Sequence, residues 1–182
     1  MKTKHKYILS LSLFSLFLGS LAFYIYQQSQ NFQTQEVSEP GAFPNIAFYD
    51  DNNRELNLDN TKAKVSLISF WATWCAPCIV EIPMFQKLYQ DFKERGFTVI
   101  PINLDDSMTE AEPLIQRLWK KNKITFNTYY DFEKKSASQL NLAGLPSNFL
   151  IDENKQIIFE SQGLIDWNSN EIRKMIEESL AN

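Results

Sequence analysis

The amino-acid sequence predicts an α/β domain with a mixed central sheet and flanking helices, preceded by an N-terminal transmembrane helix. Short apolar runs of strand length alternate with longer segments whose apolar residues recur every three or four positions. Near the end of the chain, two strand-like runs are separated by only a few polar residues, which favours an antiparallel hairpin beside otherwise parallel strands. The chain also begins with a long uncharged stretch that stands outside this pattern.

The N-terminal segment 1–26 is predicted to be a signal anchor. Its first six residues contain three lysines and no acid, and the twenty residues of 7–26 carry no charge, which is long enough to span a bilayer core. The small-x-small triplet at 20–22 leaves cleavage as a signal peptide open as the alternative. In both cases the lysines before the span keep the N-terminus in the cytoplasm, so the rest of the chain is expected on the periplasmic or outer face of the membrane.

A polar linker is predicted over 27–39, because this stretch is rich in Gln and Ser and nearly lacks apolar residues. The globular domain then occupies 40–182. Beyond residue 26 the chain has all 22 acidic residues but only 15 of the 18 Lys and Arg residues, which gives a net charge of −7. An acidic domain without a basic patch argues against nucleic acid as a partner.

The elements of the domain follow from local signals. Turns rich in Asp and Asn separate the strands of two hairpins, and apolar residues at helical spacing mark the helices. In chain order, the predicted elements are a hairpin (45–49 and 55–58), a strand (65–71), a helix (76–95), a strand (97–103), a helix (109–122), an extended piece (126–130), a short helix (134–140), a second hairpin (148–151 and 156–161) and a final helix (169–180).

The central elements have the clearest signals. The run 65–71 is mostly apolar, as expected for a strand that is covered on both faces. The helix over 76–95 is predicted to end at Gly96, since glycine readily adopts the left-handed conformation of a helix end. Thr109 and Glu112 are predicted to form a capping box at the start of the next helix.

The only two cysteines, Cys75 and Cys78, stand where the buried strand gives way to the first long helix. The free N–H groups and the positive end of the helix dipole favour a thiolate on Cys75. The second thiol lies one helical turn further and can close a reversible disulfide, while Pro77 preorganises the turn. We therefore predict a redox-active disulfide between Cys75 and Cys78.

Two other uses of the cysteine pair are weaker. A purely structural disulfide suits an exported protein, but a ring this short constrains the unfolded chain little. A zinc site needs about four ligands, and the only histidine, His5, lies in the N-terminal tail. We predict no metal and no other cofactor.

Several motifs give the chain a resemblance to a known family. The motifs are WCAPC at 74–78, Pro83 five residues after the second cysteine, and GLP at 144–146 directly before a strand. Together they resemble the thioredoxin fold, specifically the membrane-tethered TlpA/ResA-like disulfide reductases, which are related to AhpC/TSA proteins. The resemblance covers roughly residue 40 to the C-terminus and implies a thioredoxin-like fold for this part.

The resemblance implies roles for further residues. Pro146 matches the cis-proline that packs opposite the active disulfide, and the backbone of Leu145 would pair with an extended substrate segment. Glu81 matches the acid of the pattern WCxPCxxExP, so its carboxylate is expected to hold or move a proton for Cys78. The alternative is a solvated helix glutamate. Ser69 stands where cytoplasmic thioredoxins carry a buried aspartate, which makes Glu81 the expected substitute.

The tryptophans are predicted to have different roles. Trp74, directly before Cys75, is predicted to be an exposed apolar contact for protein substrates. Trp71 is predicted to lie in the core. Trp119 and Trp167 are assigned to packing, with no part in the chemistry.

These observations predict an extracytoplasmic thiol-disulfide oxidoreductase that reduces disulfides of exported proteins. By resemblance, its partners are cysteine-containing exported proteins such as apocytochrome c, and a membrane thiol-disulfide electron donor. An oxidase or isomerase of exported thiols, a peroxidase, and a redox-silent binding module for unfolded exported chains stay open as alternatives. A CxxC motif flanked by tryptophan argues against the peroxidase.

Overall fold

The computed structural model describes residues 19–20 and 41–181. The chain divides into two units, Met1–Val37 and Ser38–Asn182, and the sheet with its flanking helices lies in the second. Among the described residues, no helix is both long and apolar enough to cross a membrane. The predicted anchor, apart from residues 19–20, and the predicted linker fall outside the described part of the chain.

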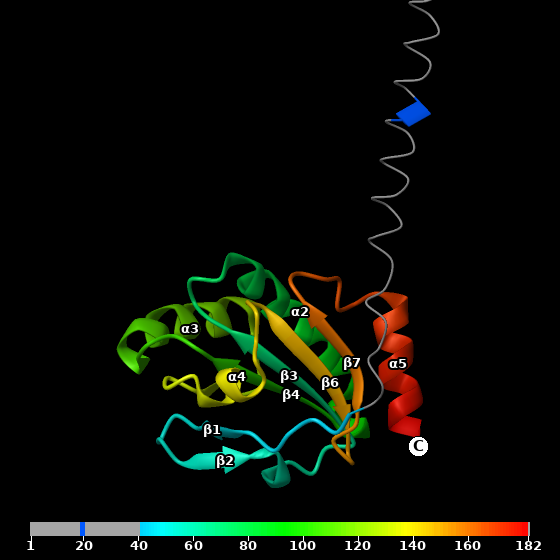
Figure 1. Ribbon diagram of the computed structural model, residues 1–182, viewed down its shortest axis with the longest axis horizontal. Helices are drawn as coiled ribbons and strands as arrows, with labels where there is room; N and C mark the ends of the chain where they lie inside the picture. The colour runs from blue at the N-terminus through cyan, green and yellow to red at the C-terminus, as the bar shows by residue number, and fades with distance from the viewer. Residues whose placement is uncertain (1–18, 21–40, 182) are drawn as a thin grey trace, which may run out of the picture. The chain divides into compact units, whose positions relative to one another are not determined.

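A seven-stranded mixed sheet forms the centre of the domain, in the order β2-β1-β5-β4-β3-β6-β7 (Figure 1). β4 is parallel to both β3 and β5, whereas β6 is antiparallel to β3 and forms a hairpin with β7. The strands are β1 (Ala47–Tyr49), β2 (Glu55–Asn57), β3 (Val65–Trp71), β4 (Phe97–Asn103), β5 (Tyr129–Tyr130), β6 (Ser147–Asp152) and β7 (Ile157–Gln162). The helices are η1 (Leu58–Asn60), α2 (Ala76–Phe92), η2 (Lys93–Arg95), α3 (Met108–Asn122), α4 (Lys135–Gln139) and α5 (Asn170–Ala181). The predicted mixed sheet is confirmed.

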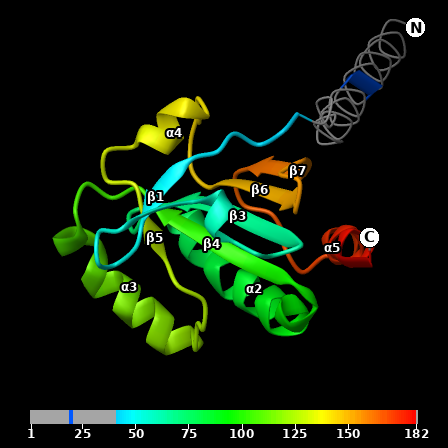
Figure 2. The ribbon, with the colours of Figure 1, turned by 90° about the horizontal axis from the view of Figure 1, so that it is seen from below.

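Strand β3 is buried along its whole length, as predicted. Because side chains alternate across a strand, Leu67 and Trp71 join a core cluster with α2, α3 and α5, while Ile68 and Phe70 join a second cluster. Figure 2 shows α2 and α3 on one side of the sheet and α4 on the other. The carboxyl end of β3, where the chain turns into α2, is therefore held between two packed layers.

The first long helix ends as the sequence predicts. α2 passes into the short helix η2, and Gly96 follows at φ 101°, in the left-handed region that favours glycine. The carbonyl of Gly96 then accepts the N–H groups of Lys64 and Val65 at 2.8 and 3.2 Å. The end of α2 is thus tied to the start of β3.

The predicted capping box of α3 is wrong. The N-cap is Ser107, which has an extended backbone and whose Oγ accepts the N–H of Glu110 at 3.4 Å. Thr109 lies inside the first turn, because Ser107 offers a capping hydroxyl two residues earlier. The other predicted elements agree with the structure within two residues at each end, with two exceptions: the predicted helix 76–95 corresponds to α2 and η2 together, and only Tyr129–Tyr130 of the run 126–130 forms a strand.

Candidate active site

Cys75 and Cys78 form a disulfide at the start of α2, with their Cα atoms 5.3 Å apart. Cys75 is the N-cap of the helix, and its Sγ accepts the N–H of Cys78 at 3.4 Å. Pro77 lies in the first turn, where its missing N–H removes no helical hydrogen bond. Cys75 is 5% exposed and Cys78 only 1%, so Cys75 presents the sulfur that a partner can reach.

An exposed tryptophan directly precedes the disulfide. Trp74 is 71% exposed, and Val80 and Leu164 are the other large apolar side chains exposed among the described residues. Trp74 and Leu145 line the same groove, which has a volume of about 240 Å³. Trp71, in contrast, is fully buried in the core, as predicted.

The peptide bond between Leu145 and Pro146 is cis, as the resemblance implies. The carbonyl of Pro146 accepts the N–H of Gly163 at 2.9 Å. The backbone N–H and carbonyl of Leu145 have no hydrogen-bond partner among the described residues. Because Leu145 also lines the groove at Trp74, these groups are available to pair with an extended segment that enters it.

Glu81 is buried on α2, one helical turn beyond Cys78 and on the same side of the helix. Its Oε1 accepts the N–H of Ile165 at 3.1 Å and the indole N–H of Trp167 at 3.0 Å, and its Oε2 accepts the amide of Asn148 at 3.1 Å. Burial raises the pKa of Glu81, and the three hydrogen bonds oppose this rise only in part. The alternative of a solvated glutamate is wrong.

Asn148 and Trp167 contact Glu81, although the sequence does not identify them as site residues. Trp167 packs against Phe85 and Phe159, as predicted, and it also donates the hydrogen bond to Glu81. Asn148 lies on β6, and its side-chain Oδ1 is buried without a hydrogen-bond partner among the described residues. The sequence signal that could have identified Asn148 is its place in a predicted strand, since an amide side chain within a buried strand needs polar partners.

Asp105 fixes the backbone just before the disulfide. Its Oδ2 accepts the N–H of Thr73 at 3.0 Å and the amide of Asn103 at 2.6 Å, and its Oδ1 accepts the hydroxyl of Thr73 at 2.8 Å. Asp105 and Asn103 are both buried. Because Thr73 directly precedes Trp74, these bonds hold the active-site loop against the end of β4.

Replacing Asp105 with alanine should lower the free energy of unfolding by about 3 kcal/mol, because three donors, one of them on the buried Asn103, lose their acceptor. Asp106 is the matched control: it is exposed and, among the described residues, pairs only with Lys134, so Asp106→Ala should change stability by less than about 1 kcal/mol. Guanidinium unfolding of both variants measures the difference. Equal losses would contradict this role of Asp105.

No group of three or more His, Cys, Asp or Glu side chains that could hold a metal ion occurs within residues 41–181.

Comparison with known proteins agrees with this geometry. The Redoxin family matches residues 38–176. The thiol-disulfide oxidoreductase ResA of Geobacillus kaustophilus is 28% identical over 163 residues, which cover 87% of this chain and 90% of that protein. ResA of Bacillus subtilis is 25% identical over 159 residues, which cover 87% and 86%.

Solved structures show the same fold. A thiol:disulfide interchange protein from Bacteroides sp. aligns with a TM-score of 0.64 at 23% identity, covering 78% of this chain and 91% of that one. The thioredoxin domain of a thiol-disulfide oxidoreductase from Bacteroides vulgatus aligns with a TM-score of 0.64 at 20% identity, covering 80% and 99%. The predicted thioredoxin-like fold is confirmed. Since the family match extends over most of the domain that carries the dithiol, this chain belongs to the Redoxin family, among its TlpA/ResA-like thiol-disulfide oxidoreductases.

Proposed function

We propose that this chain reduces disulfides in exported proteins, with apocytochrome c as one such substrate, while segment 1–26 anchors it to the membrane. The observation that carries the proposal is the disulfide at the start of α2 with the buried carboxyl group of Glu81 one turn behind it. The charge pattern of segment 1–26 supports an extracytoplasmic domain. The domain would meet its substrates on the periplasmic or outer face of the membrane.

The reaction begins with the reduced pair. The Cys75 thiolate attacks one sulfur of the partner's disulfide; that bond breaks, and the other partner sulfur leaves as a thiolate and takes a proton from water. The Cys78 thiolate then attacks Sγ of Cys75 and releases the second partner sulfur. Two electrons have passed to the partner, and the Cys75–Cys78 disulfide remains.

Glu81 accepts the proton that Cys78 must lose before this second attack. Its Oε1 already accepts two hydrogen bonds, whereas Oε2 accepts only the one from Asn148, so Oε2 is the oxygen with room for the proton. Once Oε2 carries a proton, rotation of the Asn148 amide presents its unpaired Oδ1 to that proton. Asn148 can therefore pair with both the charged and the neutral form of Glu81.

The substrate would bind beside the disulfide as an extended segment. The free backbone groups of Leu145, next to the cis-proline Pro146, would pair with the main chain of that segment. Trp74 would cover its apolar side chains, because the indole ring is both exposed and adjacent to the reactive sulfur. A membrane thiol-disulfide electron donor would then return two electrons to the oxidised pair.

The reduction potential of the Cys75–Cys78 pair tests the direction of electron flow. The full chain in detergent micelles, equilibrated against thiol-disulfide buffers, should give a value near the thioredoxin end of the range, about −270 mV. A value of about −120 mV would overturn the reductase and favour the oxidase or isomerase. The double variant Cys75→Ser/Cys78→Ser tests the remaining alternative. A redox-silent binding module would keep full function in this variant, whereas a reductase, oxidase or isomerase would lose it.

A further inference from the structure

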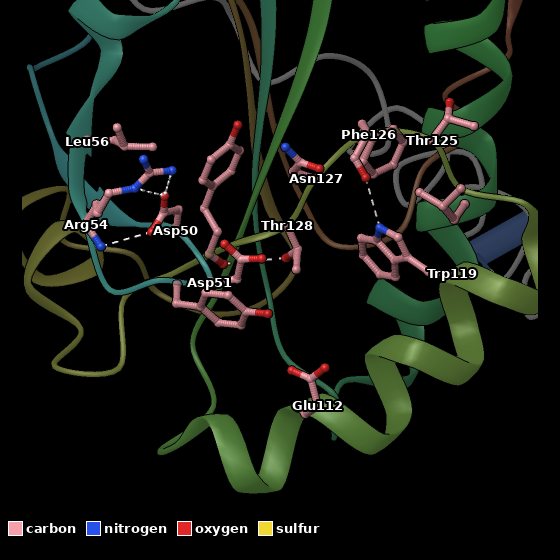
Figure 3. A pocket seen from close by; sticks show the side chains of 13 residues that line it. Asp50, Asp51, Arg54, Leu56, Glu112, Trp119, Thr125, Phe126, Asn127 and Thr128 are labelled. Carbon is pink, nitrogen blue, oxygen red and sulfur yellow. Dashed lines mark hydrogen bonds and ion pairs between the residues drawn. The ribbon is translucent and has the colours of Figure 1, made fainter.

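A second pocket shares no lining residue with the groove at Trp74. It has a volume of about 450 Å³ and lies between the β1–β2 turn, α3 and the segment that leads from α3 into β5 (Figure 3). The turn contributes Asp50, Asp51 and Arg54, and α3 contributes Glu112 and Trp119. The volume is in the range of small-ligand sites.

The charges around this pocket do not cancel. The carboxylate of Asp50 accepts the backbone N–H of Arg54 and pairs with its guanidinium group at 2.6 Å, and both lower the pKa of Asp50. Neither Asp51 nor Glu112 forms an ion pair among the described residues: each accepts one amide, from Asn52 at 2.7 Å and from Gln116 at 2.6 Å respectively. The second oxygen of each carboxylate has no partner among the described residues. The pocket therefore keeps two uncompensated negative charges.

An unpaired phenol supports the case for a ligand. Tyr130 is 3% exposed and lines the pocket, and its hydroxyl has no hydrogen-bond partner among the described residues. Burial, together with the charges of Glu112 and Asp51, raises the pKa of Tyr130 to about 12. The hydroxyl is thus a protonated group that can accept as well as donate, and it belongs to a side chain that is otherwise buried in the wall of the pocket.

Part of the remaining wall is aromatic or apolar, beside the polar Thr125, Asn127 and Thr128. The indole N–H of Trp119 donates to the carbonyl of Phe126 at 2.9 Å, as Figure 3 shows, and the ring stacks on Trp71 with centroids 5.6 Å apart. Leu56 and Ile124 also line the pocket. Such walls favour an alkyl stem, and aromatic faces attract a cation.

We propose that this pocket binds a primary ammonium group on an alkyl stem. The ammonium would donate to the free oxygens of Asp51 and Glu112 and to the hydroxyl of Tyr130, while the stem would lie against Trp119 and the apolar walls. A lysine side chain of a partner protein and a free alkylamine share this chemistry. The inference does not depend on the direction of electron flow at Cys75 and Cys78.

The indole N–H signals of the full chain, labelled with ¹⁵N-tryptophan in detergent micelles, test the proposal. The Trp119 signal, assigned with Trp119→Phe, should shift saturably with the probe Nα-acetyl-lysine methylamide and with n-butylamine. The uncharged Nα-acetyl-norleucine methylamide has the same stem and should cause no saturable shift. Tighter binding of the lysine derivative would support a protein side chain as the ligand, and equal binding of n-butylamine would support a free amine.

Matched variants distinguish the pocket from general attraction to an acidic protein. Glu112→Gln should weaken binding of the lysine derivative about two- to five-fold, as expected for loss of one partly exposed charge pair. Tyr130→Phe should weaken it as well, whereas Glu110→Gln, on the same helix but outside the pocket, should not. Equal shifts with the lysine and norleucine derivatives, absence of saturation, or unchanged binding in Glu112→Gln would overturn the proposal.

Discussion

Replacing Cys75 with serine should abolish disulfide reduction, and replacing Cys78 with serine should stop the reaction at the mixed disulfide. Cys75 has the sulfur that a partner can reach, at a helix start where N–H groups stabilise a thiolate. Without it no attack occurs. Without Cys78 the attack still takes place, but no second thiolate resolves the product. Insulin, a protein with accessible disulfides, is a suitable probe for the purified full chain.

Non-reducing gel electrophoresis separates these outcomes. Cys78→Ser should give a covalent adduct with insulin that thiol treatment releases, and Cys75→Ser should give none. An adduct formed by Cys75→Ser but not by Cys78→Ser would mean that the roles of the two cysteines are reversed.

A third variant, Trp74→Ala, should form the adduct more slowly yet resolve it at the normal rate, since Trp74 is placed to contact the partner and not the leaving sulfur.

Replacing Glu81 with glutamine should slow the resolving step by about 10²- to 10⁴-fold, the usual range for loss of a general base. Glutamine has the same shape, and its Oε1 can still accept the N–H groups of Ile165 and Trp167. Its amide can donate to Oδ1 of Asn148 once the Asn148 amide rotates. The fold should therefore survive while the proton acceptor is lost.

A rapid-mixing measurement of mixed-disulfide decay at pH 7 gives the rate. The variant should recover toward the wild-type rate as the pH rises, because the Cys78 thiol then loses its proton directly to solvent. Glu94→Gln, an exposed change just beyond α2, is the control and should leave the rate unchanged. A normal rate in Glu81→Gln at pH 7 would exclude Glu81 as the proton acceptor.

The same substitution should also change how stability depends on pH. Burial raises the pKa of Glu81 above its ordinary value of 4.5, so between 4.5 and the raised value the folded state binds more protons than the unfolded state. The contribution of Glu81 to the free energy of unfolding is therefore complete below pH 4.5 and is lost as the pH rises through that window. In Glu81→Gln this loss should be absent. Guanidinium unfolding of both oxidised proteins at several pH values measures it.

The sequence predicts most of the fold because the main signals are local. The apolar run of β3, the helical spacing of α2 and the polar turn of the β6–β7 hairpin each depend on neighbouring residues. The start of α3 was misplaced for a related reason: Ser107 and Thr109 are both good N-caps, and only the backbone conformation at Ser107 selects between them. The strand β5 is short, so its residues give little periodic signal.

The site was predictable only as far as its motif extends. Cys75, Cys78 and Glu81 lie within residues 75–81, at the N-cap and start of α2, and the pattern around them identifies all three. The contacts of Glu81 with Asn148 and Trp167 join positions 67 and 86 residues apart in the chain. Such pairs depend on how β6 and the segment before α5 pack against α2, which local spacing does not determine. The uncompensated carboxylates of Asp51 and Glu112 in the pocket of Tyr130 could not be predicted from the sequence for the same reason.

The dispersed origin of the donors to Glu81 has a consequence for the order in which this protein becomes active. The dithiol motif is complete as soon as residues 74–78 have been synthesised, but two of the three donors to Glu81, Ile165 and Trp167, follow at the far end of the domain. Under the proposed mechanism, both cysteines are therefore present before the hydrogen-bond donors to their proton acceptor, Glu81, have been made. Ile165 and Trp167 lie within the last 18 of the 182 residues, so the surroundings of Glu81 are complete only once nearly the whole domain has been made.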